Sequence, residues 1–133
     1  MPRPVTLRDG SVPADTLLVV RGGPLTVETL RQDCDITARR FLYQGRPLWG
    51  FSVEGTDTDW PVERILRDGR VRSRQLYATC SVRELRQLGC ETLATFGVEP
   101  PHYTVRMVDS HMLEAVAQLL IQRTRANPNW TPR

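Results

Sequence analysis

Residues 16–24 read Thr16-Leu17-Leu18-Val19-Val20-Arg21-Gly22-Gly23-Pro24, an apolar and partly β-branched run that two glycines and a proline end abruptly. A short apolar run with such a stop predicts a buried strand. Arg21 stands at the exit of this strand, where the glycines let the backbone approach a ligand and leave amide groups uncovered. We therefore expect Arg21 to lie at the edge of a functional site.

Strands and helices alternate along the rest of the chain. Helical spacing predicts helices over 26–42, 61–67 and 82–88 and from about 110 onward, and Ser81 with Glu84 forms a capping box before the third. Further strands are expected at 48–53, 75–79, 91–96 and 102–108. The pattern predicts an α/β fold, with α+β as the alternative, built on a central mixed sheet of about five strands with three to four helices.

The length of 133 residues fits one domain. We predict an N-terminal arm over 1–15, a single α/β domain over 16–125 and a frayed C-terminal tail over 126–133. The sequence contains neither a membrane-spanning apolar stretch nor a signal peptide, so a cytoplasmic protein is expected. The three cysteines fit no zinc pattern and are expected to be reduced, buried thiols.

Arginine alone supplies the positive charge, with 18 basic residues, no lysine and a net charge of +3. A cluster within the segment 64–74 consists of Arg64, Arg67, Arg70, Arg72 and Arg74. Guanidinium groups match phosphate oxygens bidentately, so Arg70, Arg72 and Arg74 are candidates for binding an RNA backbone. A solvated surface turn is the alternative interpretation of this segment.

Alternate residues of the strand 102–108 share one face of the sheet. This places His102, Thr104 and Arg106 together, opposite a core set that begins with Tyr103. An imidazole can move a proton near neutral pH, a hydroxyl can bind a phosphate oxygen, and a guanidinium can stabilise developing charge. The set predicts phosphoryl chemistry, with Tyr103 of the same segment kept as a candidate substrate-binding residue. A polar outer face without activity is the alternative.

Two other groups of polar residues favour structural roles. His111 stands where the last helix begins and is expected to be structural or exposed. The carboxylates of the segment 54–63 match no metal-ligand spacing, so we predict a solvated loop and no metal site there. These carboxylates belong to Glu54, Asp57, Asp59 and Glu63.

Four segments carry a resemblance that spans about residues 17–108. They are Val19-Val20-Arg21-Gly22-Gly23, Gly50-Phe51-Ser52-Val53, Ser81 through Leu85-Arg86-Gln87-Leu88-Gly89, and Pro100-Pro101-His102-Tyr103-Thr104-Val105. Their order resembles that of a toxin-type domain found at the C-terminal tips of bacterial Rhs-type and related polymorphic toxins, and in stand-alone actinobacterial proteins. Pro100 departs from the family's asparagine and Ser81 from its threonine. The resemblance implies a toxin with site candidates Arg21, Ser52, Ser81, His102 and Thr104.

The favoured interpretation is the toxin of a bacterial toxin–antitoxin or polymorphic toxin system, acting as a metal-independent ribonuclease without a cofactor. In this interpretation His102 moves a proton, while Arg21 and Arg106 stabilise the charged phosphorane. Thr104 or Ser81 positions the phosphate. RNA is the expected substrate, and a cognate antitoxin or immunity protein is the expected partner.

Two other functions fit parts of the same sequence. Val20-Arg21-Gly22 resembles the arginine strand of the Arg-Ser-Glu class of ADP-ribosyltransferases, and Ser52 and Glu91 follow in the order of that class. This resemblance implies a toxin that uses NAD. The third possibility is a non-catalytic protein-binding module in which the polar face of the strand 102–108 is an interface.

Overall fold

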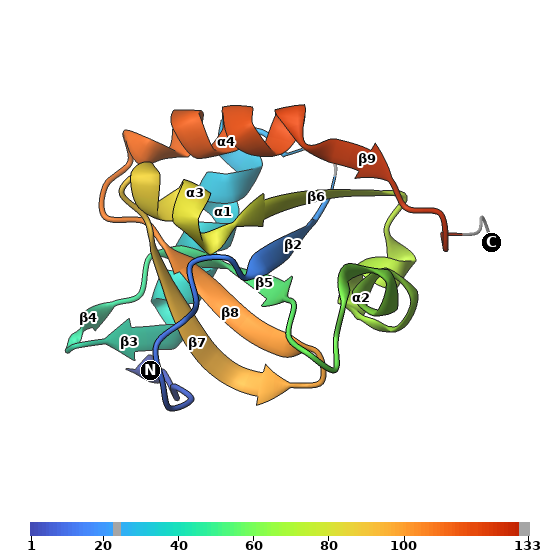
Figure 1. The fold of residues 1–133 in the computed structure, drawn as a ribbon. Coiled ribbons are helices and arrows are strands. Elements are labelled where there is room, and N and C mark those ends of the chain that lie inside the picture. The colour runs from blue at the N-terminus through green and yellow to red at the C-terminus, as the bar shows by residue number, and fades with distance from the viewer. Residues whose placement is uncertain (23–24, 131–133) are drawn as a thin grey trace.

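The computed structural model describes residues 1–22 and 25–130 and contains two sheets (Figure 1). The larger sheet has six strands in the order β7-β8-β5-β2-β6-β9, and the smaller has three in the order β1-β3-β4. The larger is built from β2 (Leu17–Arg21), β5 (Gly50–Gly55), β6 (Leu76–Ser81), β7 (Glu91–Val98), β8 (Pro101–Arg106) and β9 (Thr124–Ala126). The smaller is built from β1 (Arg3–Pro4), β3 (Phe41–Tyr43) and β4 (Arg46–Pro47). The predicted combination of helices with a central sheet is confirmed.

The six-stranded sheet is antiparallel throughout, whereas a mixed sheet of about five strands was expected. Alternation of strand and helix favours parallel crossovers only when the helix leads directly into the next strand of the same sheet. Here the β3–β4 hairpin lies between the first helix and β5, and it reverses the chain through Gln44 and Gly45, both with positive φ. The only parallel pair within the described residues is β1 with β3.

Four α-helices and one 3₁₀ turn cover the two faces of the larger sheet unequally. They are α1 (Val27–Arg40), α2 (Val62–Asp68), η1 (Arg70–Ser73), α3 (Val82–Gln87) and α4 (Met112–Gln122). The expected capping box is present, because Ser81 accepts from the Glu84 amide, and α1 is capped in the same way by Thr26, which accepts from the Thr29 amide. Helices α1, α3 and α4 lie on one side of the sheet, and α2 with η1 lies on the other (Figure 1).

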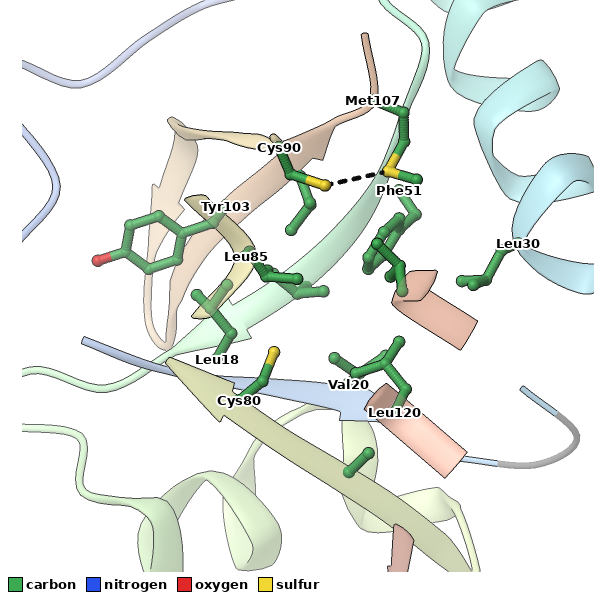
Figure 2. Close-up of a cluster of buried hydrophobic side chains, with 14 of the residues drawn as sticks. Leu18, Val20, Leu30, Phe51, Cys80, Leu85, Cys90, Tyr103, Met107 and Leu120 are labelled. Carbon is green, nitrogen blue, oxygen red and sulfur yellow. Dashed lines mark hydrogen bonds between the residues drawn. The ribbon is translucent and has the colours of Figure 1, made fainter. Parts of the chain in front are cut away.

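The main core fills the space between the sheet and helices α1, α3 and α4 (Figure 2). Tyr103 and Val105 of β8, and Met107 directly after it, point into this core, as the alternation predicted. All three cysteines are free and buried, and burial raises the pKa of Cys80 to about 12. The side chains that Figure 2 labels are Leu18, Val20, Leu30, Phe51, Cys80, Leu85, Cys90, Tyr103, Met107 and Leu120.

A smaller apolar cluster fixes α2 and η1 to the opposite face of the sheet. Val19 of β2 contributes to it, and the helical side supplies Trp60, Ile65, Leu66 and Val71. Val19 and Leu18 therefore lie in different clusters, as neighbours in a strand must. Beside this cluster, on the same face, Ser52 of β5 is exposed and His102 of β8 is half-buried.

Both ends of the chain are held more firmly than the sequence predicted. In the arm, Val12 is buried, Arg8 N donates to Ala94 O at 2.8 Å, and Leu7 forms a bridge with Thr95. In the tail, buried Asn127 donates from Nδ2 to Val71 O at 3.2 Å. Residues 131–133 of the tail lie outside the described part of the chain. The strands near the two ends, β1 and β9, have only two and three residues. Strands this short, and single hydrogen bonds, leave no periodic signal in a sequence.

Within residues 1–22 and 25–130, none of the helices combines the length and the apolar character that crossing a membrane requires.

The capping box at α3 gives a direct test of the fold. Ser81→Ala removes the hydroxyl that accepts from Glu84 N at 3.1 Å, so we expect the free energy of unfolding to fall by about 0.5–2 kcal/mol. Urea denaturation measures the change, with Ser110→Ala at an exposed position as the control. Equal stability of Ser81→Ala and the wild type would contradict the capping role.

Candidate active site

Polar side chains gather on the face of the sheet opposite the main core, where β2, β5 and β8 end near one another. In register, His102 of β8 lies opposite Glu54 of β5, and Thr104 lies opposite Ser52. The pairing of β2 with β5 stops at Val19 and Glu54, while β2 stays paired with β6 as far as Arg21. The two strands therefore separate beside His102. A cavity of about 30 Å³ lined by Arg21, Ser52, Glu54 and His102 lies in this gap.

Two larger cavities meet at this gap. The loop-side cavity, about 530 Å³, lies against η1 and the residues before it, and the arm-side cavity, about 570 Å³, lies against Arg3–Thr6 and the end of α1. Both are lined by Arg70, Phe96 and His102. We call the two cavities together the cleft. In Figure 1, β8 lies between the N-terminal arm with β3 and β4 on one side and α2 on the other.

His102 is half-buried at the centre of the cleft. Its Nδ1 lies 2.5 Å from Thr95 Oγ1, which in turn lies 3.3 Å from Thr104 Oγ1. Both hydroxyls are buried, so this chain satisfies groups that would otherwise be costly to hide from water. The second ring nitrogen, Nε2, has no hydrogen-bond partner among residues 1–22 and 25–130. The arrangement fixes the ring through one nitrogen and leaves the other for a ligand.

The backbone around His102 is held by a bulge and by the N-terminal arm. Gly97, in the irregular part of β7, has φ 122, and a Cβ there would stand 3.2 Å from His102 Cβ. Arg8 donates to His102 O at 2.5 Å and to Thr95 O at 2.8 Å, and its guanidinium stacks 4.8 Å from the centre of the Tyr103 ring. Arg8 thus ties β7 to β8 at the level of the imidazole.

Charge and burial set the protonation state of His102. Burial lowers its pKa below the ordinary value of 6.5, and the nearby guanidinium groups of Arg70 and Arg8 lower it further. Desolvation and a neighbouring positive charge both disfavour the imidazolium form. The lowered pKa favours the neutral imidazole, whose Nε2 can accept a proton.

Glu54 anchors the arginine-bearing turn above the sheet. Its buried Oε1 accepts from Arg70 N at 2.9 Å, and burial raises the pKa of this carboxyl against the lowering effect of Arg70. Gly69 makes the approach possible, since a Cβ there would stand 2.8 Å from Glu54 Oε1. The prediction of a solvated carboxylate loop is thus wrong for Glu54, which lies in β5, and holds for exposed Asp57 and Asp59.

Six of the predicted site residues line the cleft. These are Arg21, Ser52, Arg70, Arg72, His102 and Thr104. Gly22, the residue after Arg21, lies so close to Leu76 that a Cβ on it would stand 2.4 Å from Leu76 C. Gly23 lies outside the described residues. The glycine after Arg21 therefore serves strand packing.

The structure does not bring the other predicted site residues to the cleft. Ser81 pairs with Leu17 at the far end of β2, where it caps α3. Arg106 reaches Glu91, with Nη1–Oε1 at 3.5 Å. Tyr103 points into the main core. Arg74 is exposed after η1 and lines neither cavity.

The cleft also contains residues that the sequence did not predict there. Glu54, Thr95, Phe96 and Gly97 all line it. Alternation from Leu93 would have placed Thr95 on the His102 side, but the bulge that presents Phe96 cannot be inferred from spacing. His111 is exposed at the start of α4, in agreement with its expected minor role.

Within the described ranges, no group of three or more His, Cys, Asp or Glu side chains is placed to hold a metal ion. Comparison of the chain with protein-family models, with curated proteins and with solved structures yields no match.

The pKa of His102 can be tested directly. An NMR titration of the ring protons should have its midpoint below 6.5, and Arg8→Gln should raise that midpoint because one guanidinium is removed. Arg83→Gln, at an exposed position on α3, is the control. Since the unfolded chain binds the proton first as the pH falls, the free energy of unfolding should decrease from about pH 6.5 downward until the folded pKa is passed. A midpoint at or above 6.5 would contradict the described environment.

Proposed function

We propose that this protein is a ribonuclease that cuts RNA by attack of the ribose 2′-OH on the neighbouring phosphate, using its own side chains. The observation that carries the proposal is a half-buried histidine with a lowered pKa, whose Nε2 has no hydrogen-bond partner among the described residues and which lies between arginines that line the same cleft. Proton transfer and stabilisation of anionic charge are the two functions that this reaction needs. His102 supplies the first, and Arg21 and Arg70 supply the second.

His102 and water together account for every proton that moves in this reaction. With its hydrogen on Nδ1, His102 donates to Thr95 Oγ1 and takes the 2′-OH proton on Nε2. The bond from O2′ to phosphorus forms as the bond to O5′ breaks, while the guanidinium groups hold the phosphorane oxygens. Water protonates the leaving O5′, and the hydroxide so formed takes the proton from the imidazolium. The products are a 2′,3′-cyclic phosphate and a 5′-OH end.

Ser52 and Arg21 contribute to phosphate binding in this proposal. Both are exposed and line the small cavity next to His102, so a phosphate there can meet a hydroxyl and a guanidinium together. Glu54 acts as a positioning residue, because it contacts the backbone of Arg70 rather than the substrate. DNA is excluded as a substrate by chemistry alone, since it lacks the attacking hydroxyl.

Cleavage of RNA in EDTA tests the proposal. His102→Ala should reduce the rate by about 10²- to 10⁴-fold, the usual contribution of a positioned acid–base group. His111→Ala, which changes the only other histidine of the chain at an exposed site, should leave the rate unchanged. Intact RNA at high concentrations of the wild type, or equal loss in both variants, would overturn the assignment.

The biological setting that we propose is a bacterial toxin acting in the cytoplasm, restrained by an antitoxin or immunity protein. Support comes from the resemblance to the polymorphic-toxin domain, three of whose implied site residues, Arg21, Ser52 and His102, meet at one cavity. Induced expression in a bacterial host should arrest growth, whereas His102→Ala and Arg21→Ala should not. Equal growth of all three strains would favour a protein-binding module.

One observation also supports an NAD-dependent ADP-ribosyltransferase as a second candidate. Arg21 and Ser52, two residues of the Arg-Ser-Glu pattern, line the same small cavity. The third, Glu91, is paired with Arg106 and lines neither cavity of the cleft. Consumption of NAD by the wild type, with RNA left intact, would select this candidate over the ribonuclease.

A further inference from the structure

Phe96 has an unusual position on the rim of the cleft. It lies in β7 next to the Gly97 bulge, and 78% of its surface is exposed. The main core, where a phenylalanine would normally be buried, lies on the other side of the sheet. The same ring lines both the loop-side and the arm-side cavity. An exposed aromatic ring beside arginines can stack with a nucleobase, because every base presents a flat π face.

The two cavities differ in the charges on their walls. Among the described residues that line the arm-side cavity, the side chains with a full charge are Arg3, Arg40 and Arg70. The loop-side cavity combines arginines with the carboxylates of Glu54, Asp68 and Glu99. A wall of arginines alone suits a phosphate backbone, whereas a mixed wall can also accept hydrogen bonds from the edge of a base.

Arg40 and Arg3 extend the positive surface away from His102. They come from the end of α1 and from β1, whereas Arg21 and Arg70 come from β2 and η1. The arm-side cavity, about 570 Å³, is lined by His102 and Arg70 as well as by Arg3 and Arg40, so it continues from the imidazole to the N-terminal arm and the end of α1. The cleft therefore has room for a chain that continues past the reacting phosphate.

We infer that the cleft binds unpaired RNA across His102, with a base next to the scissile phosphate stacked on Phe96 and the adjoining backbone phosphate held by Arg3 and Arg40. The inference rests on the proposed ribonuclease function and specifies its substrate as an internal bond of single-stranded RNA. A base in a duplex keeps both faces stacked on its neighbours, so it cannot use the Phe96 ring.

Binding can be measured separately from cleavage with an octanucleotide whose riboses are all 2′-O-methylated, because this probe has no attacking hydroxyl. Fluorescence anisotropy should show that Phe96→Ala raises the Kd by roughly 5- to 150-fold, the loss expected for one stacked base. Phe96→Trp should restore binding. Val98→Ala, which shortens another exposed apolar residue of β7 that lines neither cavity, should change the Kd less than about twofold.

The arm-side phosphate has its own matched pair of variants. Arg40→Gln should weaken binding and reduce the slope of log Kd against log salt by about 0.7, the value for one phosphate contact in a single strand. Arg39→Gln removes an exposed arginine from the preceding position of α1, outside the cavity, and should leave the slope unchanged. A 2′-O-methyl duplex of the same sequence should bind more weakly than the single strand.

The outcomes distinguish a failure of the inferred stacking site from a failure of the proposed ribonuclease function. If the wild type cleaves RNA but Phe96→Ala binds the probe as well as Val98→Ala does, the stacking site is refuted and the ribonuclease stands. The same conclusion follows if duplex and single strand bind equally, or if Phe96→Ala impairs only the binding of a protein inhibitor. If the wild type neither binds the probe nor cleaves RNA, the ribonuclease proposal itself fails.

Discussion

The hydrogen bond from Arg70 N to the buried carboxylate of Glu54 determines the shape of the cleft. It ties the turn η1 to β5, and it is possible only because Gly69 has no Cβ to occupy the space beside Oε1. The apolar cluster around Val71 and Ile65 holds the same turn from behind. Removal of the acceptor would leave the partly buried Arg70 N–H without this partner and would release η1 from β5. The position of the Arg70 guanidinium therefore depends on a residue that need not touch a substrate.

A second constraint is the difference in polarity between the two faces of the sheet. The face that packs against α1, α3 and α4 is apolar, and the other carries hydroxyls, a histidine and a carboxylate. Thr95 and Thr104 are buried on that polar face, and their hydrogen bonds to each other and to His102 offset the loss of hydration. The same bonds leave Nε2 of the ring without a partner in the part of the chain that the structure describes. Stability and proton transfer are thus served by one small network.

The sequence predicted the features that depend on local rules. Alternation along β8 placed His102 and Thr104 on the polar face, and the Ser81–Glu84 spacing identified a capping box. The capping role also explains why Ser81 is absent from the cleft, since its hydroxyl already binds the Glu84 amide. What the sequence did not predict depends on distant pairing. The burial of Glu54, the separation of β2 from β5 and the docking of Arg8 across β7 and β8 all need partners far away in the chain.

The chemistry of the products gives the most direct test of the central claim, that His102 activates a ribose hydroxyl for attack on the adjacent phosphate. Mass spectrometry of a short single-stranded RNA of defined sequence, incubated with the wild type in EDTA, identifies the new ends. We predict a 2′,3′-cyclic phosphate paired with a 5′-OH, and no cleavage where one 2′-deoxy residue replaces the nucleotide that supplies the hydroxyl. A 5′-phosphate end, or cleavage that continues at the 2′-deoxy position, would contradict it.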